Sequence, residues 1–81
     1  MLQLYIDPSC HFCVKVTDHL ERHGIPYEPK MLSIFSDSET RRELVKLGGS
    51  SQVPFLHDAE RKVRMYESDD IIAYCDEHGR S

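Results

Sequence analysis

The sequence predicts an α/β protein in which a four-stranded mixed sheet carries helices on both faces. The hydrophobic pattern switches between strand-like and helix-like segments in the order β-α-β-α-β-β-α. A helical segment joins the first two strand candidates, which is typical of a crossover between parallel strands. A short polar turn at residues 58–61 joins the last two, which is typical of an antiparallel hairpin.

Residues 2–23 predict the first strand and the first helix. Residues 2–6 are rich in apolar strand formers, and Asp7-Pro8-Ser9 ends this run. The pattern that follows to residue 23 is helical, because its apolar side is a single stripe formed by Cys13, Val16, Thr17 and Leu20. Gly24 stands where many helices end in a left-handed residue.

The middle of the chain predicts a second strand and a second helix. Residues 27–32 are the strand candidate, although prolines stand before it and within it. Ser36 and Glu39 have the spacing of a capping box, so we expect the second helix to open there and to continue through Leu47. Gly48-Gly49 ends it.

The last third predicts a hairpin and a final helix. Residues 54–57 and 63–66 are the two short strands, and the second alternates plainly between apolar and polar side chains. Ser68 is expected to cap the last helix, with Asp69 and Asp70 in its first turn, where negative charge is favourable. Gly79 ends this helix.

Length, composition and charge limit the possible functions. At 81 residues the chain is expected to form one domain, residues 1–81, around a single modest core. A net charge of −4 argues against a nucleic-acid surface, and no apolar run approaches the length of about 18 residues of a membrane span. Three cysteines do not suit a secreted disulfide framework, because their number is odd. We therefore expect a cytoplasmic monomer that binds neither nucleic acid nor membrane.

The most informative motif is Cys10-His11-Phe12-Cys13. Two thiols three positions apart, placed between a strand and a helix, are typical of a redox pair. Positions i and i+3 share one helix face, so the second sulfur is within reach of the first for a disulfide. We expect Cys10 to be the nucleophile at the open end of the helix and Cys13 to be the resolving thiol.

Two opposing electrostatic effects act on Cys10. A helix N-terminus stabilises an anion by about 0.3 to 2 kcal/mol. Asp7, at an assumed separation of about 6 Å in a water-like dielectric, repels a thiolate by roughly 0.7 kcal/mol. The helix end is therefore expected to prevail. Half of a zinc site is the alternative for the two thiols, but such a site needs a second close pair of ligands, and only Cys75 and scattered histidines remain.

Three motifs in this order resemble the glutaredoxin family across essentially the whole chain. They are Cys10-His11-Phe12-Cys13, Gln52-Val53-Pro54-Phe55-Leu56 and Glu67-Ser68-Asp69-Asp70-Ile71. The resemblance implies a thioredoxin-like fold and a glutathione-dependent thiol–disulfide oxidoreductase that reduces protein disulfides and glutathione mixed disulfides. It also implies that the peptide bond before Pro54 is cis and lies beside the two cysteines, which the sequence by itself does not indicate.

The resemblance further implies how glutathione, the expected cosubstrate, is held. The backbone of Val53 pairs with the cysteinyl part of the tripeptide like an added strand. Ser68 and the N–H of Asp69 bind the γ-glutamyl carboxylate at the start of the last helix, and the Asp69 carboxylate meets the γ-glutamyl amine. Considered alone, Ser68 is a plain helix cap and Asp69 a surface charge. The expected glutathione site comprises Val53, Pro54, Ser68, Asp69, Glu67 and Arg41, and no metal is expected.

One departure from the glutaredoxin pattern concerns charge. Many glutaredoxins have a lysine at the position of Asp7, where it meets the glycyl carboxylate of glutathione, so we expect weaker glutathione binding here. Arg41 or Arg42 on the second helix is a candidate replacement, although each is otherwise a solvated helix charge.

A second departure lies before the last helix, where Tyr66-Glu67 replaces the usual Gly-Gly. The pair Glu67-Ser68, followed by Ile71-Ile72-Ala73-Tyr74, resembles the N-terminal domain of glutathione transferases. Those proteins append a helical domain that completes a pocket for an electrophile, and we do not expect that activity from this chain.

Two other functions remain open at this point. One is binding of an iron–sulfur cluster by two chains, through Cys10 and two glutathiones, although Phe12 is expected to crowd it. The other is a thioredoxin-fold module that only docks on partners. Cys75 is most simply a buried apolar side chain, whereas His11 and Phe12 are expected to be exposed.

Overall fold

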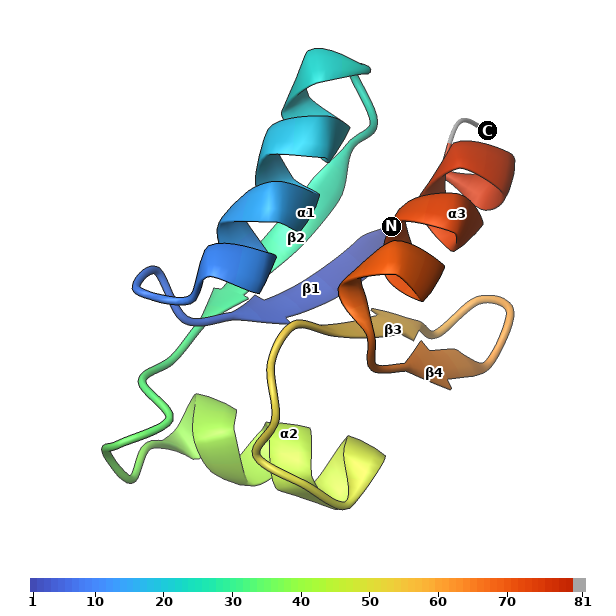
Figure 1. The fold of residues 1–81 in the computed structure, drawn as a ribbon. Coiled ribbons are helices and arrows are strands. Elements are labelled where there is room, and N and C mark those ends of the chain that lie inside the picture. Colours follow the sequence, from blue (N-terminus) through green and yellow to red (C-terminus); the bar gives the residue numbers. More distant parts are fainter. Residues whose placement is uncertain (80–81) are drawn as a thin grey trace.

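The structure, a computed structural model, describes residues 1–79. Within these residues no helix has the length and apolar character that crossing a bilayer requires. The elements follow the predicted order (Figure 1) and are β1 (Leu2–Ile6), α1 (His11–Arg22), β2 (Tyr27–Met31), α2 (Glu39–Gly48), β3 (Phe55–Asp58), β4 (Val63–Met65) and α3 (Ser68–His78).

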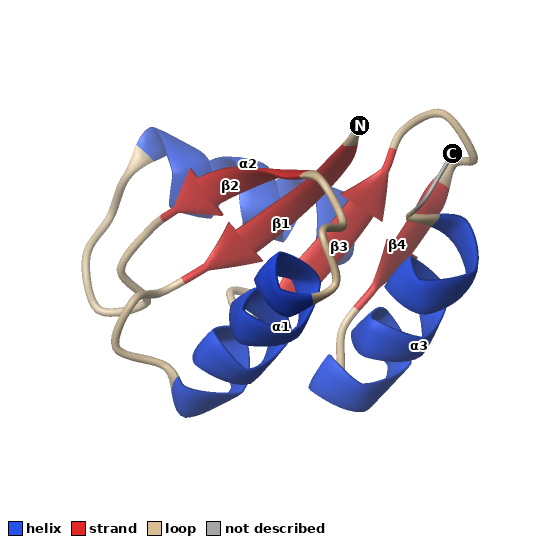
Figure 2. Ribbon diagram, turned by 90° about the horizontal axis from the view of Figure 1, so that it is seen from above, coloured by secondary structure: helices blue, strands red, loops and turns tan. Residues whose placement is uncertain are grey.

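The four strands form one mixed sheet in the order β2-β1-β3-β4. β1 and β2 are parallel, with Leu2 opposite Tyr27, and β3 pairs antiparallel with both β1 and β4. Helices α1 and α3 lie side by side on one face of the sheet, and α2 covers the other face (Figures 1 and 2). The predicted four-stranded mixed sheet with helices on both faces is confirmed.

Alternation along β1 divides the core into two layers, because neighbouring side chains point to opposite faces. The layer beneath α1 and α3 contains fully buried side chains, among them Leu4, Val16, Leu20 and Ile71. The layer beneath α2 is built around Tyr5, Leu32, Leu44 and Phe55. Complete burial of a side chain of this size contributes roughly 1.5 to 3 kcal/mol relative to exposure. The first layer fixes the helix that begins after Cys10, and the second holds α2 beneath the sheet.

Two helices begin differently from the prediction. The predicted capping box at Ser36 is wrong, because residue 36 lies in a turn whose N–H donates to the Ser33 carbonyl. Ser38 is extended instead, and its hydroxyl accepts the Arg41 N–H at 3.1 Å, which makes it the cap of α2. Ser68 is also not a cap, since it is already the first residue of α3 and Glu67 precedes it.

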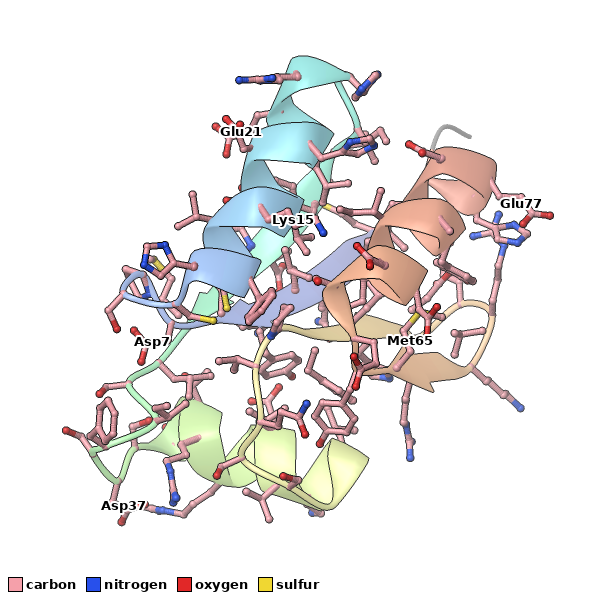
Figure 3. The ribbon with its side chains drawn as sticks, in the orientation of Figure 1. Asp7, Lys15, Glu21, Asp37, Met65 and Glu77 are labelled. Carbon is pink, nitrogen blue, oxygen red and sulfur yellow. The ribbon has the colours of Figure 1, made fainter. Side chains whose placement is uncertain are left out.

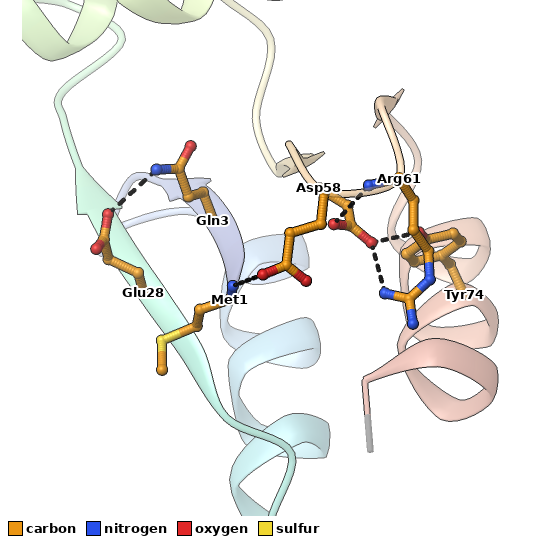
Figure 4. A network of polar contacts seen from close by, with 7 residues as sticks. Met1, Gln3, Glu28, Asp58, Arg61 and Tyr74 are labelled. Carbon is orange, nitrogen blue, oxygen red and sulfur yellow. Dashed lines mark hydrogen bonds and ion pairs between the residues drawn. The ribbon is translucent and has the colours of Figure 1, made fainter. Parts of the chain in front are cut away.

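A buried carboxylate closes the turn between β3 and β4 (Figure 4). Asp58 is 1% exposed and accepts hydrogen bonds from the Tyr74 hydroxyl at 2.6 Å and the Arg61 guanidinium at 3.1 Å. Burial alone would raise the pKa of Asp58, but the two donors outweigh it and hold the pKa below its usual range. The carboxylate therefore ties α3 to the hairpin, at the end of the sheet where β1 begins.

The outer strand β2 contains a proline at its centre. Pro29 stands opposite Leu4 of β1 in the parallel register, and no further strand pairs with β2 among residues 1–79. A proline is tolerated in such an edge strand because its missing N–H interrupts no ladder on the open side. The predicted strand therefore forms, ending at Met31.

Replacing Tyr74 with Phe is expected to destabilise the fold by about 1 to 3 kcal/mol near neutral pH, because buried Asp58 loses a donor. A carboxyl whose pKa is lowered by folding stabilises the protein above its unfolded pKa of about 3.9 and loses this contribution as the pH falls. The difference from wild type should therefore shrink below about pH 4. Urea unfolding at several pH values measures it, with Tyr27→Phe as the control for an exposed hydroxyl. A difference independent of pH would contradict an ionised Asp58.

Candidate functional site

Cys10 occupies the N-cap of α1, as predicted. Its backbone is extended, its N–H donates to the Asp7 carbonyl at 3.0 Å, and its carbonyl accepts from Val14 at 3.1 Å. No side chain caps this helix and no acidic residue stands in its first turn. The half-buried sulfur of Cys10 therefore lies beside N–H groups that favour a negative charge.

Cys13 is buried whereas Cys10 is half-buried, although only one helical turn separates them. It is 1% exposed, and burial raises the pKa of its thiol to about 12, helped by a hydrogen bond to Cys10 and by the negative charges of Cys10 and Asp7. A backbone hydrogen bond from Asp7 opposes this rise. Cys13 consequently stays protonated near neutral pH, so the two thiols are chemically distinct.

Asp7 has a structural role that the sequence analysis did not foresee. Its carboxylate accepts from the N–H and hydroxyl of Ser9, at 2.9 and 2.8 Å, and from the N–H of Ile34 at 3.2 Å. These hydrogen bonds, that of the Ser9 N–H foremost, keep the pKa of Asp7 below its usual range. The Asp-x-Ser pattern was the available signal, because Asp often bonds the backbone two residues later. Asp7 thus holds the loop that leads into α1.

A cleft of about 140 Å³ lies between the start of α1, the segment before β3 and the start of α3. Its lining residues are Phe12, Gln52, Val53, Pro54, Glu67 and Ser68. The Val53–Pro54 peptide bond is cis, as the resemblance implied. Four of the predicted glutathione-site residues therefore line one cleft together with Phe12, which lies between the two cysteines in the sequence. A larger hollow of about 250 Å³ lies at the opposite end of the sheet, lined in part by Asp58 and Arg61.

The start of α3 differs from a regular capped helix. Glu67 has a positive φ of 75°, the left-handed region that favours glycine, and its side chain makes no capping hydrogen bond. The first N–H groups of α3 therefore lack a side-chain cap beside the cleft. The Asp69 carboxylate is exposed but occupied, since Lys15 of α1 contacts it at 2.6 Å (Figure 3 labels Lys15). This partner of Asp69 lies 54 residues away in the sequence, so no local pattern indicated it.

The two arginines of α2 have different surroundings. Arg42 pairs with Asp37 at 3.1 and 3.3 Å, so it is already engaged. Arg41 lies on the side of α2 that also carries buried Leu44, and its Nε atom is buried with no hydrogen-bond partner among residues 1–79. Neither arginine lines the cleft. Of the two candidates, Arg41 is the one with a buried guanidinium nitrogen, Nε, that has no hydrogen-bond partner among residues 1–79.

The remaining candidate residues lie where the sequence indicated. Phe12 is 62% exposed, His11 is exposed, and Cys75 is fully buried in the core. Tyr5 belongs to the core, and its hydroxyl donates to the Glu43 carboxylate. Within residues 1–79, no three His, Cys, Asp or Glu side chains are grouped as metal ligands.

The fold, the paired cysteines at the start of α1 and the cis proline in the cleft beside Phe12 define a thioredoxin-like domain. Residues 9–78 match the family model of the glutathione S-transferase N-terminal domain. Because this match covers most of the chain, the protein belongs to that family. The similarity to these transferase domains found in the sequence is confirmed.

Solved structures with the same fold come from both glutathione transferases and a glutaredoxin. Glutathione transferase Omega 3C from Trametes versicolor is 22% identical (TM-score 0.79; 94% of this chain, 32% of that chain). Glutaredoxin 2 from Salmonella typhimurium, solved with glutathione, is 29% identical (TM-score 0.76; 94% and 33%). A glutathione S-transferase from the Antarctic clam Laternula elliptica is 30% identical (TM-score 0.78; 96% and 35%). The chain thus spans about a third of each of these proteins. A comparison with curated proteins gave no match.

Iodoacetamide is expected to modify Cys10 in the folded protein and to spare Cys13 and Cys75. Burial raises the pKa of these two thiols to about 12 and about 11, so neither presents an accessible thiolate near neutral pH. Mass spectrometry of the alkylated peptides measures the three rates, and the same reaction in urea, where all three should react, is the control. Equal rates at Cys10 and Cys13 in the folded state would contradict their different environments.

Proposed function

We propose that this chain is a glutathione-dependent thiol–disulfide oxidoreductase whose substrates are disulfide-containing or glutathionylated proteins. The observation that carries the proposal is the pair of unlike thiols at the start of α1: a half-buried Cys10 at the helix terminus and a buried, protonated Cys13 behind it. This asymmetry suits a nucleophile and a resolving group.

In the first step the Cys10 thiolate attacks one sulfur of the substrate disulfide. A new S–S bond forms between Cys10 and that sulfur, and the other substrate sulfur leaves as a thiolate that takes a proton from solvent. The helix N-terminus favours the attacking anion, and the S–H of Cys13 donates a hydrogen bond to it. An exposed Phe12 at the edge of the cleft offers an apolar contact to the substrate.

In the second step the mixed disulfide is resolved by one of two thiols. For a protein disulfide, Cys13 loses its proton and attacks the Cys10 sulfur. This releases the reduced substrate and leaves a Cys10–Cys13 disulfide. Two glutathiones then reduce this disulfide and leave as oxidised glutathione. For a glutathionylated substrate, Cys10 retains the glutathionyl group and one further glutathione removes it. Once Cys10 is in a mixed disulfide, its negative charge no longer opposes ionisation of Cys13.

Two backbone segments support glutathione as the reductant. Among residues 1–79, neither the N–H nor the C=O of Val53 has a hydrogen-bond partner, so both are free to pair with an extended peptide. The first N–H groups of α3, at Ser68 and Asp69, suit the γ-glutamyl carboxylate, since no side chain caps them. Glu67 and Pro54 complete the wall of this cleft. The Salmonella glutaredoxin 2, which shares this fold, was solved with glutathione.

Arg41 is proposed to supply the cation for the glycyl carboxylate. It carries an unused buried donor, whereas Arg42 is paired with Asp37. Because Arg41 does not line the cleft in the unliganded protein, this contact needs a movement of the long side chain. Asp7 does not line the cleft either. Unlike the Arg41 guanidinium, its carboxylate is already held by three hydrogen bonds, from Ser9 and Ile34.

Cys10→Ser is expected to abolish glutathione-dependent reduction of a glutathionylated peptide, because the attacking sulfur is gone. Cys13→Ser should retain this activity and lose reduction of an intramolecular protein disulfide, which needs the resolving thiol. A coupled assay of oxidised glutathione measures both, and Cys75→Ala, which removes the third thiol from outside the Cys10–Cys13 motif, is the control. Full activity of Cys10→Ser would disprove the mechanism.

Lys15→Gln is expected to lower the KM for glutathione by about 1.5-fold to 5-fold, the range for release of an exposed ion pair. In the free protein Lys15 occupies the Asp69 carboxylate, so it competes with the γ-glutamyl amine for the same oxygen atoms. Lys46→Gln on α2 removes the same charge away from Asp69 and is the matched control. An unchanged or higher KM in Lys15→Gln alone would show that Asp69 does not bind the amine.

A further inference from the structure

Tyr66 connects the two walls of the cleft, although these are separate in the sequence. One wall is the segment Gln52–Pro54 before β3, and the other begins at Glu67, the residue after Tyr66. The Tyr66 hydroxyl donates to the Ser50 carbonyl at 2.9 Å and accepts from the Ser50 N–H at 3.2 Å. A single hydroxyl thereby binds both backbone groups of one residue in the loop that leads to Val53.

The ring of Tyr66 is itself fixed from two sides. It packs on Phe55 with ring centroids 4.7 Å apart and an interplanar angle of 47°. At the end of α2, a Cβ added to Gly48 would lie 2.1 Å from the Tyr66 hydroxyl oxygen and 2.8 Å from the Phe55 ring. Glycine at position 48 is therefore what allows the hydroxyl to approach the loop so closely.

Between residues 50 and 53, the loop that links α2 to the cis proline makes few hydrogen bonds within the part of the chain that the structure describes. Within the loop, Gln52 donates to the Ser50 hydroxyl at 3.3 Å. Among residues 1–79, the two hydrogen bonds of Tyr66 are the only ones that connect residues 50–53 to another element. The Val53 side chain packs against both core layers, and the Tyr66 hydroxyl fixes the backbone of Ser50, from which the chain runs to Val53.

We propose that Tyr66 is a positioning residue, which holds the 50–53 loop so that the free N–H and C=O of Val53 face an extended thiol peptide. This inference rests on the proposed function, in which that peptide is glutathione. Tyr66 does not touch the reacting sulfur atoms; it acts through the loop backbone. Its hydroxyl should therefore affect the binding of glutathione and leave the reactivity of Cys10 unchanged.

The test is Tyr66→Phe, which keeps the ring on Phe55 and removes only the hydroxyl. The KM for glutathione in reduction of a glutathionylated peptide is expected to rise about threefold to tenfold, with kcat within about twofold of wild type. Hydrogen exchange of the Ser50 amide, which donates to the Tyr66 hydroxyl at 3.2 Å, should accelerate in this variant when it is measured without glutathione. The rate of Cys10 alkylation should not change. The matched control is Tyr27→Phe, which removes a tyrosine hydroxyl from the outer strand β2, where it donates to Glu21 of α1.

Gly48→Ala provides a second variant that keeps the hydroxyl and displaces it, because the new methyl group overlaps the tyrosine oxygen. It is expected to raise the KM for glutathione in the same direction. If wild type uses glutathione and Tyr66→Phe matches it in KM or in Ser50 exchange, the positioning role is wrong while the proposed function stands. If wild type shows no glutathione-dependent turnover and no shift of the Val53 amide on titration with glutathione, the proposed function fails and the positioning role fails with it.

Discussion

The three hydrogen bonds accepted by the Asp7 carboxylate connect the end of β1, the loop before α1 and the segment after β2. The carbonyl of the same residue accepts the N–H of Cys10, so Asp7 also fixes the backbone at the residue that precedes α1. A lysine, which has donors only, cannot accept these hydrogen bonds. The aspartate is therefore more than a surface charge, because its carboxylate holds together the loop that leads into α1. The unlike environments of Cys10 and Cys13 follow from this arrangement.

The fold follows from local pattern and topology, so the sequence was sufficient for it. The apolar stripe of α1, the run in β1 and the hairpin turn each favour one structure, and the handedness of crossovers leaves few arrangements for them. The helix starts were harder to predict, because several polar residues before each helix have capping side chains. Ser38 rather than Ser36 caps α2 because Ser38 has an extended backbone directly before the helix, whereas Ser36 lies in the preceding turn, and this depends on how the chain leaves β2.

The site was predictable where its residues lie in short motifs and unpredictable where they meet through the fold. Cys10, Cys13 and the residues around Pro54 were all found from sequence spacing and resemblance. Lys15 and Asp69 are 54 residues apart, and Tyr66 reaches Ser50 across 16, so no local signal reports either contact. Glu67 has a positive φ, a conformation that a glycine at this position would have indicated and that a glutamate does not.

Pro29 at the centre of β2 has a consequence for crowded solutions. An exposed sheet edge is a template on which another chain can add a strand and begin a fibril, and proline opposes this because it offers no N–H to the newcomer. The opposite edge, β4, is only three residues long, which gives an incoming strand little to bind. Both borders of the sheet are thus poor seeds for amyloid growth, and the native molecule needs no covering partner at either border to resist it.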